Sequence, residues 1–320
     1  MTDPMIETER LLLREYTPDD FDALHEIMSD PETMQHYPAP FDEARTRRWI
    51  EWNIENYAQY GFGLWAVILK ETGAFIGDCG ITIQNIDGEM LPEIGYHIHK
   101  QYWRRGFAKE AARAVRDWVF QHTEYDTVYS YMKYTNIGSW STALANGMRK
   151  VKEYPDPKNT VSYAFAITRR EWETLKKVTI RKIEEKDYPA VAAIWREVLD
   201  IPTATDSIVT ETYKKMKADS GYRTYVAETD GKVVGLAATA FVLAIGHPNG
   251  YIKMNGLGVL PEYQHQGIGR LLLNRVEKLA RECGALYIGL ASGLRRTEAH
   301  DFYEHLGYQK TSYWFRKNLE

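Results

Sequence analysis

The sequence predicts two α+β domains in tandem, each with a mixed, mostly antiparallel, twisted sheet and helices on both faces. Three observations predict this. The chain has 320 residues, more than one hydrophobic core usually organises. Three blocks of the first half recur in the same order in the second half. In each half, short strand-like runs alternate with segments whose apolar residues have helical spacing.

The recurring blocks set the domain count. Arg14 matches Arg181 and Asp20 matches Asp187 within the first block. One match could arise by chance, but three in one order indicate two copies of one fold, the alternative being two unrelated domains with similar patterning. The matching blocks are residues 11–28 with 178–195, 94–111 with 255–272, and 143–150 with 303–310.

The charged, polar segment 168–178 separates the two copies, so we predict domains of residues 1–172 and 173–320. In the first copy, alternating apolar residues indicate strands and helical spacing indicates helices. The expected order is a strand at 9–16, helices near 18–30 and 42–58, two strands within 62–83, a strand at 92–99, a helix at about 106–121, a strand at 127–134, a helix near 137–146 and a strand at 161–168.

The second copy repeats this order. Asp230-Gly231 is a strong hairpin signal between two strands. Leu272, Val276 and Leu279 share one face of a helix that ends in a glycine. The expected elements are a strand at 176–183, helices at 185–199 and 207–219, two strands within 222–244, a strand at 251–260, a helix at 267–284, a strand at 285–291, a helix at 295–307 and a closing strand at 308–317.

Composition excludes several classes of protein. The chain is 44% hydrophobic and 26% charged, with a formal net charge of -4, so we expect a globular protein without a nucleic-acid partner. The start lacks a secretory signal, and the longest mostly apolar stretch, 235–246, is too short to span a bilayer. Cys79 and Cys283 have no metal-ligand spacing. We therefore expect no membrane partner, no metal and a cytoplasmic location. The sequence does not identify the oligomeric state, and a monomer and a homodimer both stay open.

Gly267 and Gly269 open the helix predicted at 267–284, after a polar loop. Glycine costs stability there, so a ligand is expected to approach the backbone closely. The unpaired N–H groups of a helix start bind anions such as phosphate. The spacing does not fit a Walker loop, which needs Gly-Lys-Ser/Thr, or a dinucleotide fingerprint, which needs a third glycine or alanine.

Gln264-x-x-Gly267-x-Gly269 resembles the acyl-CoA pyrophosphate motif Q/R-x-x-G-x-G/A of the GNAT superfamily of N-acetyltransferases, and residues 299–308 resemble its second motif. The first half resembles the ribosomal-protein N-acetyltransferase branch, although Trp103 stands where Gln or Arg is usual. The resemblance covers nearly the whole chain as two tandem domains, an arrangement similar to mycothiol synthase.

This resemblance implies acetyl-CoA as co-substrate, bound where a central strand parts from its neighbour. Backbone groups of that strand would pair with the pantetheine arm, and the Val259 N–H would polarise the acetyl carbonyl. The implied binding residues of the second copy are Leu257, Gly258, Val259, Gln264, His265, Gln266, Gly267, Ile268, Gly269 and Arg270. Those of the first are Tyr96, His97, Ile98, Arg104, Arg105, Gly106, Phe107, Ala108 and Lys109.

The resemblance also implies two catalytic residues. Tyr303 matches a tyrosine that protonates the departing thiolate, and packing beside neighbouring aromatic residues is the alternative. The first copy has Ala143 there, so it would either use another acid, such as Ser139, or not catalyse the reaction. Glu93 lies where some relatives carry a general base, whereas the second copy has Met254. A solvated carboxylate at a strand end is the alternative for Glu93.

The expected function is acetyl-CoA-dependent transfer of an acetyl group to a primary amine by direct attack in a ternary complex. The intact motif and Tyr303 favour the second domain as the catalyst. The alternative is a protein that binds CoA as a sensor or structural ligand without transfer. The sequence does not identify the acceptor amine.

Overall fold

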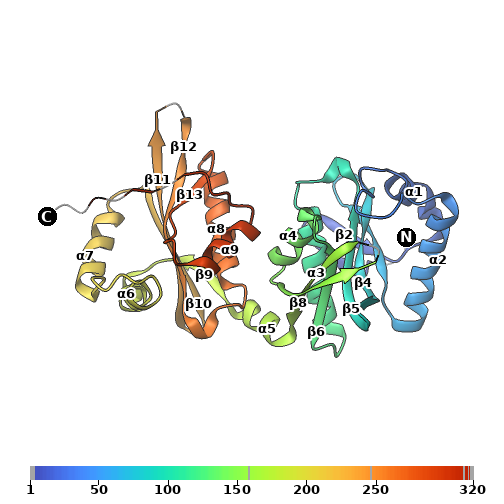
Figure 1. Ribbon diagram of the computed structural model, residues 1–320, viewed down its shortest axis with the longest axis horizontal. Coiled ribbons are helices and arrows are strands. Elements are labelled where there is room, and N and C mark those ends of the chain that lie inside the picture. The colour runs from blue at the N-terminus through green and yellow to red at the C-terminus, as the bar shows by residue number, and fades with distance from the viewer. Residues whose placement is uncertain (1–3, 158, 246, 313, 316, 318–320) are drawn as a thin grey trace. The chain divides into compact units, whose positions relative to one another are not determined.

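The structure is a computed structural model of the chain and describes residues 4–157, 159–245, 247–312, 314–315 and 317 (Figure 1). The chain separates into two compact units, residues 1–172 and 173–320. Helix α5 (Arg169–Lys177) contains the point where one unit ends and the next begins. The charged segment 168–178 is therefore mostly helical.

The first unit is built on one eight-stranded sheet with the order β1-β2-β3-β4-β5-β6-β8-β7. Neighbouring strands are antiparallel except β5 and β6, which are parallel. This parallel contact is limited to Glu93 and Tyr129, so β5 and β6 part along the rest of their length. The strands are β1 (Ile6–Glu7), β2 (Leu11–Arg14), β3 (Leu64–Leu69), β4 (Ala74–Ile86), β5 (Glu89–Ile98), β6 (Thr127–Lys133), β7 (Arg149–Asp156) and β8 (Thr160–Thr168).

Helices cover both faces of this sheet (Figure 1). Side chains alternate along a strand, and β3 shows the consequence. Leu64 and Ala66 join a buried cluster with residues of α1 and α2, whereas Trp65 points the other way and meets Trp118 of α3, with ring centroids 4.9 Å apart. The helices are α1 (Phe21–Met28), α2 (Glu43–Tyr60), α3 (Phe107–His122) and α4 (Ile137–Ala145).

The second unit has a five-stranded sheet with the order β13-β12-β11-β10-β9. Its parallel pair, β12 and β13, is joined from Ile252 with Ile288 to Met254 with Leu290, and β12 then continues without that neighbour. The predicted hairpin is confirmed, because Asp230 and Gly231 turn the chain with φ angles of 48° and 76°. The strands are β9 (Thr179–Lys182), β10 (Tyr222–Thr229), β11 (Lys232–Ala244), β12 (His247–Val259) and β13 (Ile288–Leu290).

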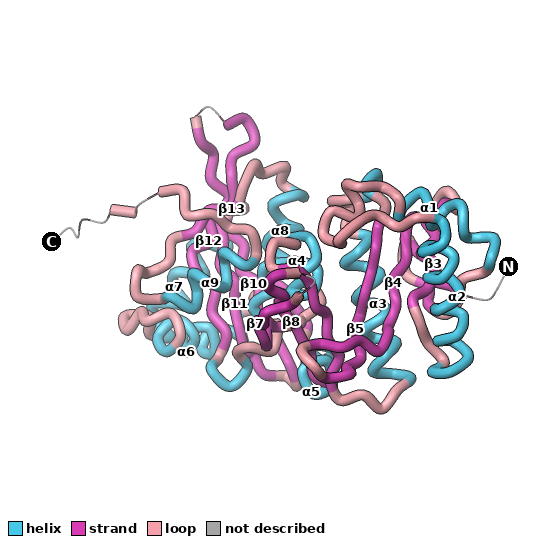
Figure 2. Tube along the Cα trace, turned by 45° about the vertical axis from the view of Figure 1, so that its right-hand side comes forward, coloured by secondary structure: helices cyan, strands magenta, loops and turns pink. Residues whose placement is uncertain are grey.

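The second sheet is also covered on both faces. Val226 packs with residues of α6 and α7, whereas Tyr225 and Ala227 pack with α8 on the opposite face. Strands β11 and β12 extend past the other strands as a long hairpin (Figure 2). The helices are α6 (Tyr188–Glu197), α7 (Asp206–Lys217), α8 (Ile268–Glu282) and α9 (Thr297–His305).

The matched residues of the two copies form the same contact. Arg14 donates to both carboxylate oxygens of Asp20 at 2.7 and 2.6 Å. Arg181 donates in the same way to Asp187 at 2.6 and 2.9 Å. In both units the ion pair ties the strand that opens the repeat to the turn before the first helix. The internal repeat read from the sequence is therefore also a repeat in structure.

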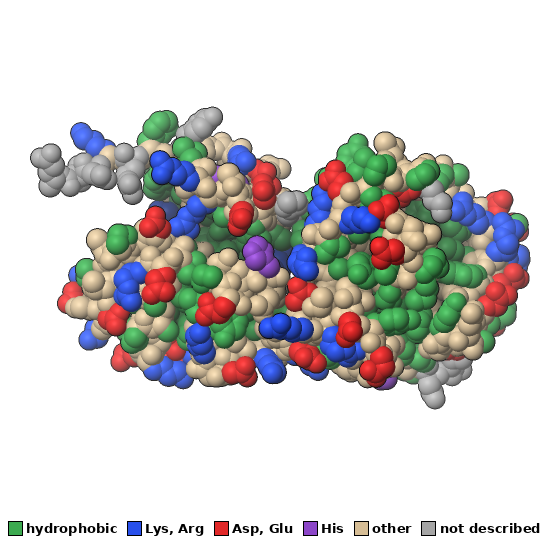
Figure 3. Space-filling model, turned by 60° about the horizontal axis from the view of Figure 1, so that its bottom comes forward, with side chains coloured by type: hydrophobic (Ala, Val, Ile, Leu, Met, Phe, Trp, Pro, Cys, Tyr) green, Lys and Arg blue, Asp and Glu red, His purple; other side chains and the backbone are tan. Residues whose placement is uncertain are grey.

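Three elements differ from the prediction. Strands β1 and β7 were not expected, and the described residues between 308 and 317 form no strand. Within the part of the chain that the structure describes, no helix is both long and apolar enough to cross a bilayer. On the face shown in Figure 3, basic and acidic side chains are interspersed rather than gathered by sign.

Candidate functional site

Both units place a glycine at the start of the helix that follows the parted strand. α3 begins after Gly106 and α8 begins after Gly267, with glycine φ angles of 83° and 80°. This left-handed region favours glycine, which explains the residue type at both places. No side chain caps either helix, so the N–H groups of each first turn point towards the preceding loop. The geometry suits an anion in both units.

Trp103 departs from the expected motif in residue type but makes the same contact as Gln264 of the second unit. Its indole N–H donates to the carbonyl oxygen of Ile98, the last residue of β5, at 2.6 Å. In the second unit the amide of Gln264 donates to the carbonyl oxygen of Val259, the last residue of β12, at 2.9 Å. Both side chains therefore fix the end of the parted strand against the loop.

Arg10 holds the loop of the first unit in place. Its guanidinium donates to the carbonyl oxygen of Arg105 at 3.0 Å and to the carboxylate of Glu110, in the first turn of α3, at 2.6 Å. It also lies over the ring of Phe107, 4.3 Å from the centroid. Glu110 accepts a further hydrogen bond from the hydroxyl of Thr8 at 2.6 Å. The turn between β1 and β2 thus anchors the start of α3.

The backbone of the parted strand points alternately to its neighbour and to the gap. The His97 N–H donates to a carboxylate oxygen of Asp78 on β4 at 3.0 Å, so the groups of Tyr96 and Ile98 are those that face the gap. In β12, the backbone carbonyl of Gly258 points towards β11, so the backbone groups of Leu257 and Val259 are those that face the gap. Two of the three residues expected from each strand therefore face the gap.

The other expected cofactor residues fall into three groups. The side chains of Phe107 and Ile268 are buried, so only their backbone N–H groups could contact a ligand. Arg270 lies along its own helix and pairs with Glu277 at 3.1 Å. The remaining residues lie in the loop or on the first turn of the helix, with Arg104, Arg105 and His265 exposed and Ala108, Lys109, Gln266 and Gly269 half-buried.

Glu93 is buried on β5, which excludes the alternative of a solvated strand-end carboxylate. The pKa of Glu93 is raised to about 8, chiefly by burial and also by the charge of Asp78, while hydrogen bonds from the Thr82 hydroxyl and the Tyr131 backbone partly offset the rise. The carboxylate lies along the strand over Gly95, where a Cβ would come within 3.0 Å of Oε2. A buried carboxyl group that titrates near neutral pH is suited to accept a proton.

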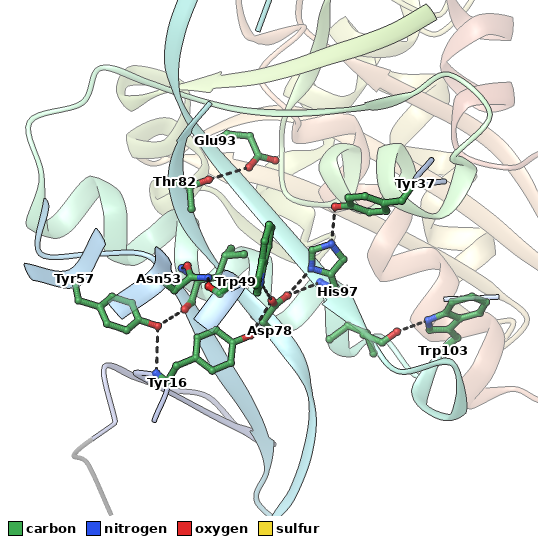
Figure 4. Close-up of polar contacts among 12 residues, drawn as sticks. Tyr16, Tyr37, Trp49, Asn53, Tyr57, Asp78, Thr82, Glu93, His97 and Trp103 are labelled. Carbon is green, nitrogen blue, oxygen red and sulfur yellow. Dashed lines mark hydrogen bonds and ion pairs between the residues drawn. The ribbon is translucent and has the colours of Figure 1, made fainter. Parts of the chain in front are cut away.

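A chain of hydrogen bonds ends on the same side of β5 as Glu93 (Figure 4). His97 Nδ1 lies 2.7 Å from the carboxylate of Asp78, and its Nε2 lies 2.6 Å from the hydroxyl of Tyr37. Asp78 has no exposed surface and also accepts from the hydroxyl of Tyr16 at 2.9 Å and the indole of Trp49 at 3.2 Å. These donors hold the carboxylate, which in turn orients the imidazole.

The sequence contained one signal for these hydrogen bonds around Asp78. Asp78 is a lone carboxylate within the otherwise apolar run at residues 74–81. A buried carboxylate needs donors to offset its lost hydration, which predicts partners. The identity of those partners depends on how α1, α2 and the loop between them pack on the sheet. His97 was expected only as a backbone contact of the cofactor.

The corresponding face of the second unit is filled by apolar side chains. A Cβ at Gly256 would meet Trp195 at 2.4 Å, and one at Gly258 would meet Ile194 at 2.9 Å. Met254, which occupies the position of Glu93, is buried as well. Residues from α6 and its C-terminal end therefore pack against the strand positions that match Gly95 and His97 of the first unit.

Tyr303 on α9 packs between aromatic neighbours. Its ring centroid lies 5.4 Å from that of Phe302 and 5.6 Å from that of Tyr308. Burial raises the pKa of Tyr303 to about 12. Phe302 in turn lies against the start of α8, because a Cβ at Gly269 would be 3.4 Å from its ring. The aromatic-packing role considered for Tyr303 is thus present in the structure.

The first unit has a different pair of hydroxyl groups near its gap. The hydroxyl of Tyr96 lies 2.9 Å from the Ser139 carbonyl oxygen and 3.0 Å from Ser139 Oγ, in the first turn of α4. The matched residues of the second unit are Leu257 and Ala299, which carry no hydroxyl. Ala143, at the position of Tyr303, is buried. The first unit therefore carries hydroxyl groups at positions where the second unit has none, and the second carries the Tyr303 hydroxyl where the first has Ala143.

Comparison with known proteins identifies both halves. Residues 10–149 match a family described as acetyltransferase (GNAT) domain, and residues 179–308 match the acetyltransferase (GNAT) family. The uncharacterized protein YkkB of Bacillus subtilis (strain 168) is 36% identical over 126 residues, which cover 39% of this chain and 73% of that protein. The uncharacterized N-acetyltransferase YnaD of the same organism is 29% identical over 173 residues, covering 52% and 98%.

Solved structures are also similar to part of this chain. The crystal structure of the acetyltransferase from Agrobacterium tumefaciens str. C58 covers 52% of this chain and 95% of its own, with 29% identity and a TM-score of 0.46. The likeness to mycothiol synthase stays a prediction.

Proposed function

The chain belongs to the GNAT acetyltransferase family, with two GNAT domains in tandem, and on this premise we propose that it transfers an acetyl group from acetyl-CoA to a primary amine. The proposed mechanism is direct attack by the amine in a ternary complex. We place the acceptor in the first domain. The observation that supports this most is the buried carboxyl group of Glu93, whose pKa is raised to about 8 chiefly by burial and which lies over Gly95 on the same strand.

In the first domain the helix start at Gly106 would hold the diphosphate of acetyl-CoA, and the gap-facing groups of Tyr96 and Ile98 would hold its pantetheine arm. Ionised Glu93 accepts a proton from the acceptor ammonium, because only the neutral amine is a nucleophile. The nitrogen attacks the thioester carbonyl, and a strand N–H stabilises the oxyanion. The C–S bond then breaks, the thiolate takes a proton from a hydroxyl donor, and the attacking nitrogen gives its second proton back to that donor as the amide forms. The hydroxyl of Ser139, bonded to Tyr96, supports Ser139 as that donor.

The motif and Tyr303 favoured the second domain as the catalyst when only the sequence was considered. The apolar filling over Gly256 and Gly258 and the aromatic packing of Tyr303 argue for a different role. We propose that the second domain binds CoA through the helix start at Gly267 without transferring acetyl. The alternative function, CoA binding as a sensor or structural ligand, would then apply to the second domain alone.

A matched pair of variants tests the assignment. Ala108→Glu and Gly269→Glu each put a carboxylate on the first turn of one helix, where it repels a diphosphate. We expect Ala108→Glu to abolish thiol release from acetyl-CoA with a panel of primary amines, and Gly269→Glu to preserve it. Calorimetric titration with CoA should give two sites in the native chain and one in each variant. Loss of turnover in Gly269→Glu with full turnover in Ala108→Glu would reverse the assignment.

A further inference from the structure

We propose that Tyr37 contacts the acceptor amine in the first domain, an inference that rests on the proposed function. His97 and Asp78 are positioning residues that fix the Tyr37 hydroxyl for this contact. The acceptor nitrogen would then lie between the carboxylate of Glu93, which lies over Gly95, and the phenol oxygen of Tyr37. The chemical class selected is a primary amine that carries at least two N–H donors.

The geometry of β5 places these groups together. Glu93, Gly95 and His97 follow at every second residue, so they share one face of the strand. Glu93 bends along the strand over Gly95, towards His97. The pKa of Tyr37 is raised by burial of its hydroxyl and by the negative charges of Glu93 and Asp78, so the phenol and the carboxylate are electrostatically coupled.

The direction of each proton follows from the donors and acceptors. The Asp78 carboxylate accepts only, so the imidazole presents an N–H from Nδ1. Nε2 is then the acceptor of the Tyr37 hydroxyl proton. The lone pairs of the Tyr37 oxygen remain to accept an N–H from a ligand. Without Asp78, the imidazole could present either nitrogen, and the phenol would lose its fixed direction.

Tyr37 is placed to meet a ligand from solution. It lies in the loop after α1, and 39% of its surface is exposed, although its hydroxyl is bonded to buried His97. Its ring also contacts Phe41 edge-on, with centroids 6.1 Å apart. The phenol is therefore held by packing and one hydrogen bond, while part of the residue remains exposed. The matched face of the second domain has glycine at the position of His97, Gly258.

Steady-state kinetics of the full chain test the contact, with the primary amine of highest turnover in the panel as probe. We expect Tyr37→Phe to raise KM for that amine by about tenfold, the effect of losing one hydrogen bond to a charged group. KM for acetyl-CoA should stay unchanged. Tyr60→Phe, which alters another exposed tyrosine at the end of α2, is the matched control and should change neither constant.

The positioning role has its own readout, which does not depend on turnover. In ¹⁵N-histidine-labelled protein, with the His97 signals assigned by comparison with His97→Gln, we expect the neutral Nδ1–H tautomer. Tyr37→Phe should shift the Nε2 signal, and Asp78→Asn should abolish the Nδ1–H preference. An unchanged amine KM in Tyr37→Phe, or an Nε2–H or doubly protonated His97, would overturn the inference. If instead Glu93→Gln transfers acetyl at the native rate, the proposed function itself fails.

Discussion

The buried carboxyl of Glu93 gives a prediction about stability that can be checked without knowing the acceptor. Its pKa rises from 4.5 to about 8 in the folded chain because burial disfavours the charged form. Between these two pH values the folded state holds a proton that the unfolded state has released. Folding stability therefore falls as the pH rises through this window, and the contribution of the protonated group is fully present only below about pH 4.5.

The size of the effect follows from the shift. One pKa unit corresponds to about 1.4 kcal/mol, so the full shift corresponds to at most about 5 kcal/mol above pH 8. Glu93→Gln keeps the shape of the side chain and removes the ionisation. We expect the variant to be more stable than the native chain by about 2–4 kcal/mol at pH 9 and nearly equal to it at pH 4.5.

Scanning calorimetry at several pH values between about 4.5 and 9 would measure this difference as a higher melting temperature of the first domain in Glu93→Gln than in the native chain. The difference should grow with pH and reach several degrees at about pH 9. Glu89→Gln, an exposed position on the same strand, is the control and should leave the curve in place. Native turnover should rise with pH through about 8, whereas Glu93→Gln should lose transfer. A stability difference that is constant from pH 4.5 to 9 would refute the buried, protonated Glu93.

Three further predictions concern the first domain. Trp103→Gln should keep acetyl-CoA affinity within about threefold by calorimetry, since the amide can still donate to Ile98, whereas Trp103→Phe should weaken it by about fivefold. Gly106→Ala should cost about 1–2 kcal/mol in urea unfolding and weaken acetyl-CoA binding, because φ is 83° there. Burial alone would raise the pKa of Asp20, but hydrogen bonds from Arg14 and Thr17 lower it below 3.8. The stabilisation from ionised Asp20 is present above pH 3.8 and is lost as the pH falls through the folded pKa. Asp20→Asn should therefore cost about 1–3 kcal/mol of folding stability at pH 7, and urea titrations should show this cost shrinking towards about pH 3.

Much of the fold was predictable because its signals are local. The match of Arg14 and Asp20 with Arg181 and Asp187 predicted a repeat. In each unit the arginine forms a bidentate ion pair with the aspartate. Strand β7 escaped prediction because its residues are mostly exposed and polar and include Pro155, as befits an edge strand. Without an alternating apolar face, such a strand has no pattern that distinguishes it from a loop.

The cofactor side of the candidate site was also predictable, because its requirements are backbone requirements. A glycine at a left-handed helix start can be recognised from its neighbours in the sequence. The acceptor side was only partly predictable. Glu93 could be singled out by its place on the strand, but Tyr37 reaches His97 from 60 residues away, through the packing of the loop after α1. No local pattern encodes a contact of that kind.

The two halves differ most where the acceptor would bind. Gly95 and Gly256 occupy matched positions on the parted strands, and in each half the missing side chain leaves space above the sheet. A carboxylate bends into that space in the first half, whereas the indole of Trp195 enters it in the second. We propose that what fills this space determines whether an amine can approach the thioester. Because the helix start that suits a diphosphate is present in both halves, we expect cofactor binding and acetyl transfer to be separable in this chain.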